Sequence, residues 1–152
     1  MGEPAYVFFD IGDTLASPRQ DAAGGLAGLD VYPFVTDVLD RLRARPAQVA
    51  GIGLISNTGT ETAAGMRRLL DEAGLARCLD DGLLLFSSVE GLDKSRPAFF
   101  ELAAARAGAV PSRCVFVGES EAERRVASAA GFLASPHPLH VFHLLDQNFS
   151  HD

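Results

Sequence analysis

Short apolar runs alternate with longer segments of helical period along this chain, and that alternation constrains its fold more than any other feature. The apolar runs predict strands at 6–9, 49–56, 83–88 and 114–118, with a short fifth at 132–135. Apolar residues spaced three and four apart predict helices over 35–42, 63–73, 97–103, 122–130 and 141–146. This order predicts a three-layer α/β fold, with a parallel sheet covered by helices on both faces.

Length and composition favour one soluble domain. The 152 residues are 47% hydrophobic, which suits one core and a single domain spanning 1–152. The net charge of −7 disfavours a nucleic-acid partner, which needs a basic surface. No apolar run approaches the ~20 residues that cross a membrane, and no basic region precedes the first apolar run. We therefore expect a cytoplasmic protein without a membrane or nucleic-acid partner.

Polar residues follow the predicted strands at the points where those strands end. In open parallel sheets, ligands bind beyond the carboxyl ends of the strands. The residues at these ends are Asp10 to Thr14, Ser56 to Thr58, Ser87 with Ser88, and Gly118 to Ser120. Hydroxyls and carboxylates prevail among them, so the sequence predicts a ligand site at this edge of the sheet.

Four ordered motifs resemble those of the haloacid dehalogenase-like (HAD) superfamily of phosphatases and phosphotransferases. "FFDIGDTL" resembles the first motif, an Asp-rich turn after an apolar strand, and "GLISNTG" resembles the second, a hydroxyl residue ending a strand. "GLDKSRPAFFELAAARAG" resembles the third, a Lys before a helix that begins at Pro, and "CVFVGESEAERRVASAAG" resembles the fourth, with its two acids. The resemblance covers nearly the whole chain and implies a Rossmann-like sheet.

Phosphoryl transfer explains these residue types chemically. It needs a nucleophile, cations that neutralise the phosphate and donors that position its oxygens. Asp10 is the expected nucleophile, forming an aspartyl-phosphate, and it could also ligate Mg²⁺. Lys94 would balance the negative charge, while Ser56 and the backbone after it, at Asn57 and Thr58, would bind the phosphoryl oxygens. The alternatives are structural: Asp10 could cap a turn, Ser56 could start a loop and Lys94 could lie on the surface.

The first motif departs from the family pattern at Gly12. The family has there an Asp that acts as general acid and base, and a glycine offers only its backbone carbonyl. The resemblance implies that this carbonyl still binds the metal while the proton-transfer role is lost. Asp13 should point elsewhere, because neighbouring side chains alternate in direction on extended backbone.

The fourth motif departs as well, since Glu119 and Glu123 stand where the family places acids that bind the metal. Each Glu is one methylene longer than Asp, and Mg²⁺ tolerates little deviation from octahedral geometry. Glu119 could reach the metal through another rotamer or through a water. For Glu123 the alternative is a structural role at a helix N-terminus.

The family's cap domain has no counterpart in this sequence. Only some eighteen residues separate Thr14 from the helix expected near Pro33, and 17–30 among them read as a loop rich in Gly and Ala, which allows a flap at most. An open site suits a macromolecular phosphorylated substrate, or closure by a second copy of the chain, and argues against dehalogenation.

These features lead to one functional hypothesis and one alternative. The hypothesis is a capless Mg²⁺-dependent HAD phosphatase whose proton transfer is impaired at Gly12. The alternative is a catalytically inactive binding or regulatory protein with the same fold.

Overall fold

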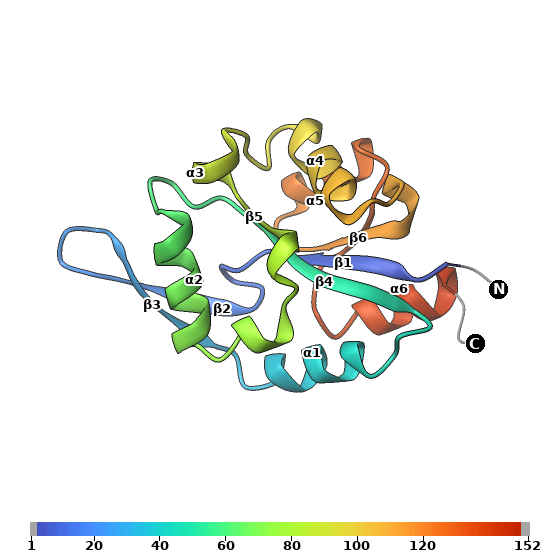
Figure 1. Ribbon diagram of the computed structural model, residues 1–152, viewed down its shortest axis with the longest axis horizontal. Coiled ribbons are helices and arrows are strands. Elements are labelled where there is room, and N and C mark those ends of the chain that lie inside the picture. Colours follow the sequence, from blue (N-terminus) through green and yellow to red (C-terminus); the bar gives the residue numbers. More distant parts are fainter. Residues whose placement is uncertain (1–2, 150–152) are drawn as a thin grey trace.

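A five-stranded parallel sheet forms the centre of the computed structural model, which describes residues 3–149 (Figure 1). The strand order is β5-β4-β1-β6-β7. The strands span Ala5–Phe9 (β1), Val49–Ser56 (β4), Leu84–Phe86 (β5), Cys114–Val117 (β6) and Leu133–Ser135 (β7). Both the parallel sheet and its five strands were expected from the alternating pattern, and both are confirmed.

Helices cover both faces of this sheet (Figure 1). One face packs against α1 (Val35–Arg43), α2 (Ala63–Glu72) and α6 (Val141–Asn148). The other packs against α4 (Pro97–Ala107) and α5 (Glu121–Ala129). Short helical turns complete the chain at α3 (Ser87–Glu90), η1 (Ala76–Cys78), η2 (Asp81–Leu83) and η3 (Pro111–Arg113). Within 3–149, no helix is both long and apolar enough to span a membrane.

The segment after β1 forms a β-hairpin, where the sequence predicts a Gly/Ala-rich loop. Strand β2 (Ala16–Gln20) pairs antiparallel with β3 (Leu26–Val31). At the turn, the carboxylate of Asp21 accepts hydrogen bonds from the amides of Ala23 (2.9 Å) and Gly25 (2.8 Å), while Gly24 adopts φ +84°. The loop prediction is wrong because this local turn chemistry closes a hairpin. We call 16–31 the flap; from Asp10 to α1, the described chain contains no cap domain.

The third predicted strand is shorter than expected. The sequence predicts a strand over 83–88, whereas β5 ends at Phe86 and the chain turns at once into α3. Ser87 and Ser88 leave the sheet because their hydroxyls bond to the loop after β4. Gly91, with φ +72°, ends this helical turn.

For the helix at 122–130 the sequence predicts an inward face of Ala122, Val126, Ala129 and Ala130, which the structure confirms only for Val126 and Ala130. Ala122 and Ala129 are exposed, whereas Ala127 and Ala130 are buried against the sheet. Alanine is a weak marker of a buried face, because it fits either side of a helix.

We expect the stability of the core between the sheet and helices α4 and α5 to depend strongly on Phe99, which is fully buried on α4. Truncating it to Ala leaves a cavity and should lower the free energy of unfolding by about 3–5 kcal/mol. Leu139→Ala is the matched control, because Leu139 is 54% exposed, and should change stability by less than about 0.5 kcal/mol. Urea unfolding followed by circular dichroism measures both. Equal effects of the two substitutions would contradict this view of the core.

Candidate active site

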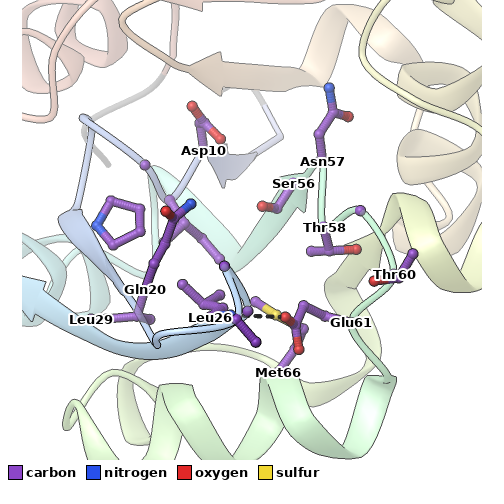
Figure 2. Close-up of a pocket in the computed structure, with 17 residues that line it drawn as sticks. Asp10, Gln20, Leu26, Leu29, Ser56, Asn57, Thr58, Thr60, Glu61 and Met66 are labelled. Carbon is purple, nitrogen blue, oxygen red and sulfur yellow. Dashed lines mark hydrogen bonds between the residues drawn. The ribbon is translucent and has the colours of Figure 1, made fainter.

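The site lies at the carboxyl ends of the three central strands. Asp10 follows β1 directly, and its amide donates to the carbonyl of Val117 at the end of β6 (2.9 Å). Ser56 ends the neighbouring strand β4, and its hydroxyl points into the same cavity as Asp10 (Figure 2). The strand order therefore brings together residues that are 46 positions apart (56 − 10) in the sequence.

Lys94 lies at the centre of a buried charge cluster. Its Nζ donates to Asp10 Oδ1 at 2.5 Å and lies 3.0 Å from Glu123 Oε1. The Lys94 side chain is only 3% exposed. Glu123 Oε1 accepts no hydrogen bond of good geometry within the described chain, so its pairing with Lys94 is mainly electrostatic. One cation thus faces two carboxylates in a region with little water.

Burial raises the pKa of the Asp10 carboxyl above its usual value of 3.8. Removing the carboxylate from water disfavours its charged form, and this outweighs the lowering by the charge and hydrogen bond of Lys94. Glu123 adds a smaller repulsion that also raises the pKa. Without Lys94, therefore, only the weaker hydrogen bond from the Ile11 backbone would offset the cost of ionising Asp10.

The backbone of Lys94 is held by Asn57. The amide of Lys94 donates to Asn57 Oδ1 at 3.0 Å. Nearby, the amide of Ser95 donates to Asp93 Oδ1 at 2.8 Å, and this turn leads into α4 at Pro97. The sequence predicts Asn57 as part of the substrate site, and the structure places it beside the cavity with its carbonyl oxygen turned to Lys94.

Thr58 is fixed by the two serines of α3. Its amide donates to Ser87 Oγ at 2.8 Å, and its hydroxyl lies 2.6 Å from Ser88 Oγ and accepts from the Ser88 amide at 3.1 Å. The side chain of Thr58 is thus committed to protein contacts, although the residue lines the cavity. The sequence shows two serines after the third predicted strand, but it does not show that they bond to Thr58.

Gly12 and Asp13, in the turn after Asp10, differ in their relation to the cavity. Gly12 lines the cavity, and a Cβ added to it would meet only Pro18, with Cγ at 3.6 Å. Asp13 is exposed, adopts φ +61° and is not among the residues lining the cavity. Asp13 therefore lies away from the cavity as expected, but because of a left-handed turn and not because of the extended backbone on which the expectation rested.

The second acid-rich turn carries Glu119 on the surface. Its amide donates to Thr14 Oγ1 at 3.2 Å, which ties this turn to the one after β1. Arg124 Nη1 donates to the carbonyl of Gly118 at 2.9 Å and holds the same turn from the α5 side. The Glu119 side chain is exposed. Across 3–149, no three His, Cys, Asp or Glu side chains converge as a metal cluster.

A cavity of about 520 Å³ opens beside Asp10, a size typical of small-molecule sites. One wall is the flap and the other is the loop between β4 and α2 (Figure 2). Besides the predicted site residues, its lining includes Pro18, Gln20, Leu26, Leu29, Glu61 and Met66. Sequence reasoning missed the four flap residues because it predicted that segment as a loop. It missed Glu61 and Met66 because their spacing does not show that this loop and α2 face the flap.

A family model describes this chain over most of its length. The model for haloacid dehalogenase-like hydrolases matches residues 20–131. The chain belongs to the haloacid dehalogenase-like hydrolase family. Because the match begins within β2, Asp10 lies outside it, and a role for Asp10 in the HAD site stays a prediction from the first motif.

Solved structures share the HAD fold at low sequence identity. A HAD-superfamily hydrolase of subfamily IA, variant 1, from Geobacter sulfurreducens PCA has a TM-score of 0.69 at 16% identity, covering 93% of this chain and 99% of that chain. A HAD-superfamily hydrolase from Ehrlichia chaffeensis has a TM-score of 0.68 at 13% identity, covering 97% of this chain and 98% of that chain. An uncharacterized protein from Listeria monocytogenes serotype 4b has a TM-score of 0.75 at 15% identity, covering 94% of this chain and 99% of that chain.

The search of curated proteins found no significant match to this HAD chain.

We predict that Asp10 makes the stability of the protein depend on pH in a definite direction. Because its pKa is raised in the folded state, folded Asp10 binds its proton more tightly than unfolded Asp10. Its contribution to stability is then complete below pH 3.8, the usual value, and is lost as the pH rises through the folded pKa. The free energy of unfolding of wild type minus that of Asp10→Asn should fall over this range, measured by urea unfolding at stepped pH. A difference that rises with pH would mean that the attraction of Lys94 outweighs burial.

Proposed function

We propose that this HAD hydrolase is a Mg²⁺-dependent phosphatase that works through an aspartyl-phosphate on Asp10. The observation that carries the proposal is the buried Asp10 carboxylate, held 2.5 Å from Lys94 Nζ at the wall of a cavity. Strand β1 fixes the position of this carboxylate, so a phosphate ester bound in the cavity would meet an oriented nucleophile.

Each step is assigned to residues of this chain. The carboxylate of Asp10 attacks phosphorus, the new O–P bond forms, and the bond to the leaving oxygen breaks with its electron pair on that oxygen. Ser56 and the amides that follow it donate to the phosphoryl oxygens, and Lys94 offsets their negative charge. Water then attacks the aspartyl-phosphate, releases inorganic phosphate and regenerates Asp10.

The oxygen donors around Asp10 suit a hard divalent cation. Asp10 and Gly12 both line the cavity, and Glu119 lies on the adjacent turn. We propose that the Asp10 carboxylate, the Gly12 carbonyl and Glu119 hold Mg²⁺, with waters completing the shell. When bound, the ion would neutralise charge on the phosphoryl group. Glu123 stays a predicted ligand, although its carboxylate is paired with Lys94.

Gly12 shapes the substrate preference. At this position the chain has no side chain that could protonate the leaving oxygen. Leaving groups of low pKa depart without a proton, so activated aryl phosphates and acyl phosphates should be the better substrates. A cytoplasmic location, a macromolecular phosphate ester and closure of the site by a second copy all stay predictions.

We expect Gly12→Asp to raise turnover of ordinary alkyl phosphates by at least tenfold, within the ~10²–10⁴-fold range of an acid–base group. Turnover of nitrophenyl phosphate should rise much less. The space at Gly12 admits a side chain toward Pro18, so the variant should fold. Gly12→Ala is the matched control, because it adds the Cβ without the carboxyl and should leave alkyl phosphates slow. Phosphate release with and without Mg²⁺ measures all three proteins.

Two further results bear on the nucleophile. Asp10→Asn should abolish turnover of both substrate classes, and acid quenching should trap the phosphoryl group on wild-type protein only. If purified wild type turns over neither class with Mg²⁺, and Gly12→Asp restores neither, the phosphatase proposal fails. The protein would then act by binding rather than by catalysis.

A further inference from the structure

The charges that line the cavity are distributed unevenly. Within the described chain, the only titratable side chains among its lining residues are Asp10 and Glu61, and no Lys, Arg or His lines it. Lys94 belongs to the buried cluster behind Asp10. Beyond the phosphoryl end, the cavity therefore offers one carboxylate and no cation to a bound molecule.

Apolar side chains account for much of the remaining wall. Pro18, Leu26 and Leu29 come from the flap, and Met66 comes from α2. Leu26, Leu29 and Met66 lie on the side of the cavity away from Asp10, and Leu26 and Met66 adjoin Glu61 there (Figure 2). Pro18 lies nearer the Asp10 end, since a Cβ added at Gly12 would meet its Cγ at 3.6 Å. A molecule that reached from Asp10 to Glu61 would thus pass an apolar surface.

Glu61 is held in place at this far end. Its Oε1 accepts a hydrogen bond from the amide of Leu26 at 3.1 Å, which joins the loop after β4 to the first residue of β3 (Figure 2). The residue is half-buried, so its charge is only partly screened by water. Its carboxylate is therefore an oriented negative charge on the wall of the cavity.

We propose that this end of the cavity is a subsite for the leaving group that selects by charge. It takes an apolar or aromatic leaving group whose far end is neutral or, better, cationic, and it disfavours a second anionic group. The inference rests on the proposed phosphatase function, because it takes the Asp10 end as the phosphoryl site. Sugar bisphosphates, nucleoside diphosphates and phosphorylated dicarboxylates would be poor ligands, since Glu61 repels their second charge and no cation compensates for it.

The size of the effect follows from the exposure of Glu61. Charge pairs at partly exposed sites contribute a modest free energy, which corresponds to about 3- to 10-fold in affinity. We therefore expect discrimination of that size between a cationic and a neutral leaving group, and again between a neutral and an anionic one.

The test uses three para-substituted benzylphosphonates that differ only in the far group: aminomethyl, methyl and carboxylate. Their carbon–phosphorus bond resists hydrolysis, so binding can be measured by calorimetry in the presence of Mg²⁺ without turnover. Wild type should bind them in the order cationic, neutral, anionic. In Glu61→Gln, whose amide oxygen can still accept from Leu26, the three affinities should converge to within about 2-fold. Inorganic phosphate, which needs only the Asp10 end, reports whether the phosphoryl site is intact in the variant.

Glu72→Gln is the control variant. Glu72 is an exposed acid at the end of α2, is paired with Arg68 and is not among the residues that line this cavity. Glu72→Gln changes the net charge by the same amount as Glu61→Gln, and this variant should keep the wild-type order of affinities. Convergence in both variants would point to net charge rather than to a subsite, and would overturn the inference.

The outcomes separate this inference from the proposed function. Wild-type affinities that are equal for the three phosphonates, or no binding of any of them, would overturn the subsite. Binding in the expected order by a protein without Mg²⁺-dependent turnover would support the subsite and refute the phosphatase. Turnover without charge discrimination would support the phosphatase and refute the subsite.

Discussion

The ion pair between Lys94 and Asp10 is the interaction around which the site is organised. A carboxylate and an ammonium group are both withdrawn from water, and each is costly to bury alone. Their 2.5 Å contact, together with Glu123 at 3.0 Å from Lys94 Nζ, offsets part of this cost at the end of a buried strand. Removing Lys94 would leave two carboxylates facing each other, which is why the cluster must be considered as a unit.

This cluster is supported by polar side chains that hydrogen-bond across neighbouring loops. Asn57 holds the main chain of Lys94, Thr58 is held by Ser87 and Ser88, and Thr14 holds the turn at Glu119. These hydrogen bonds join the loops after β1, β4, β5 and β6. The loops are short, so small shifts in any one of them would move the charges of the site.

The flap gives the open HAD fold a bounded cavity. It covers the region beyond Asp10 with apolar side chains and is tied to the opposite loop by the contact of Leu26 with Glu61. Gly12 lies beneath it and faces Pro18. The residue that lacks the usual acid thus adjoins the segment that would contact the leaving group, so the two features together bear on which phosphate esters the site can use.

The sequence by itself determined the parallel sheet and its five strands, placed Asp10 and Ser56 at strand ends, and placed Lys94 just before the helix at Pro97. Strand and helix periods are local properties, and the carboxyl ends of parallel strands share one edge. Only the tertiary structure decided that the segment after β1 is a hairpin, that α3 interrupts the predicted third strand, and that Glu61 faces the same cavity as Asp10. It also decided that Glu123 pairs with Lys94 while Glu119 lies exposed. These outcomes depend on contacts between residues distant in the chain, and the spacing of residue types along one sequence does not encode those distances.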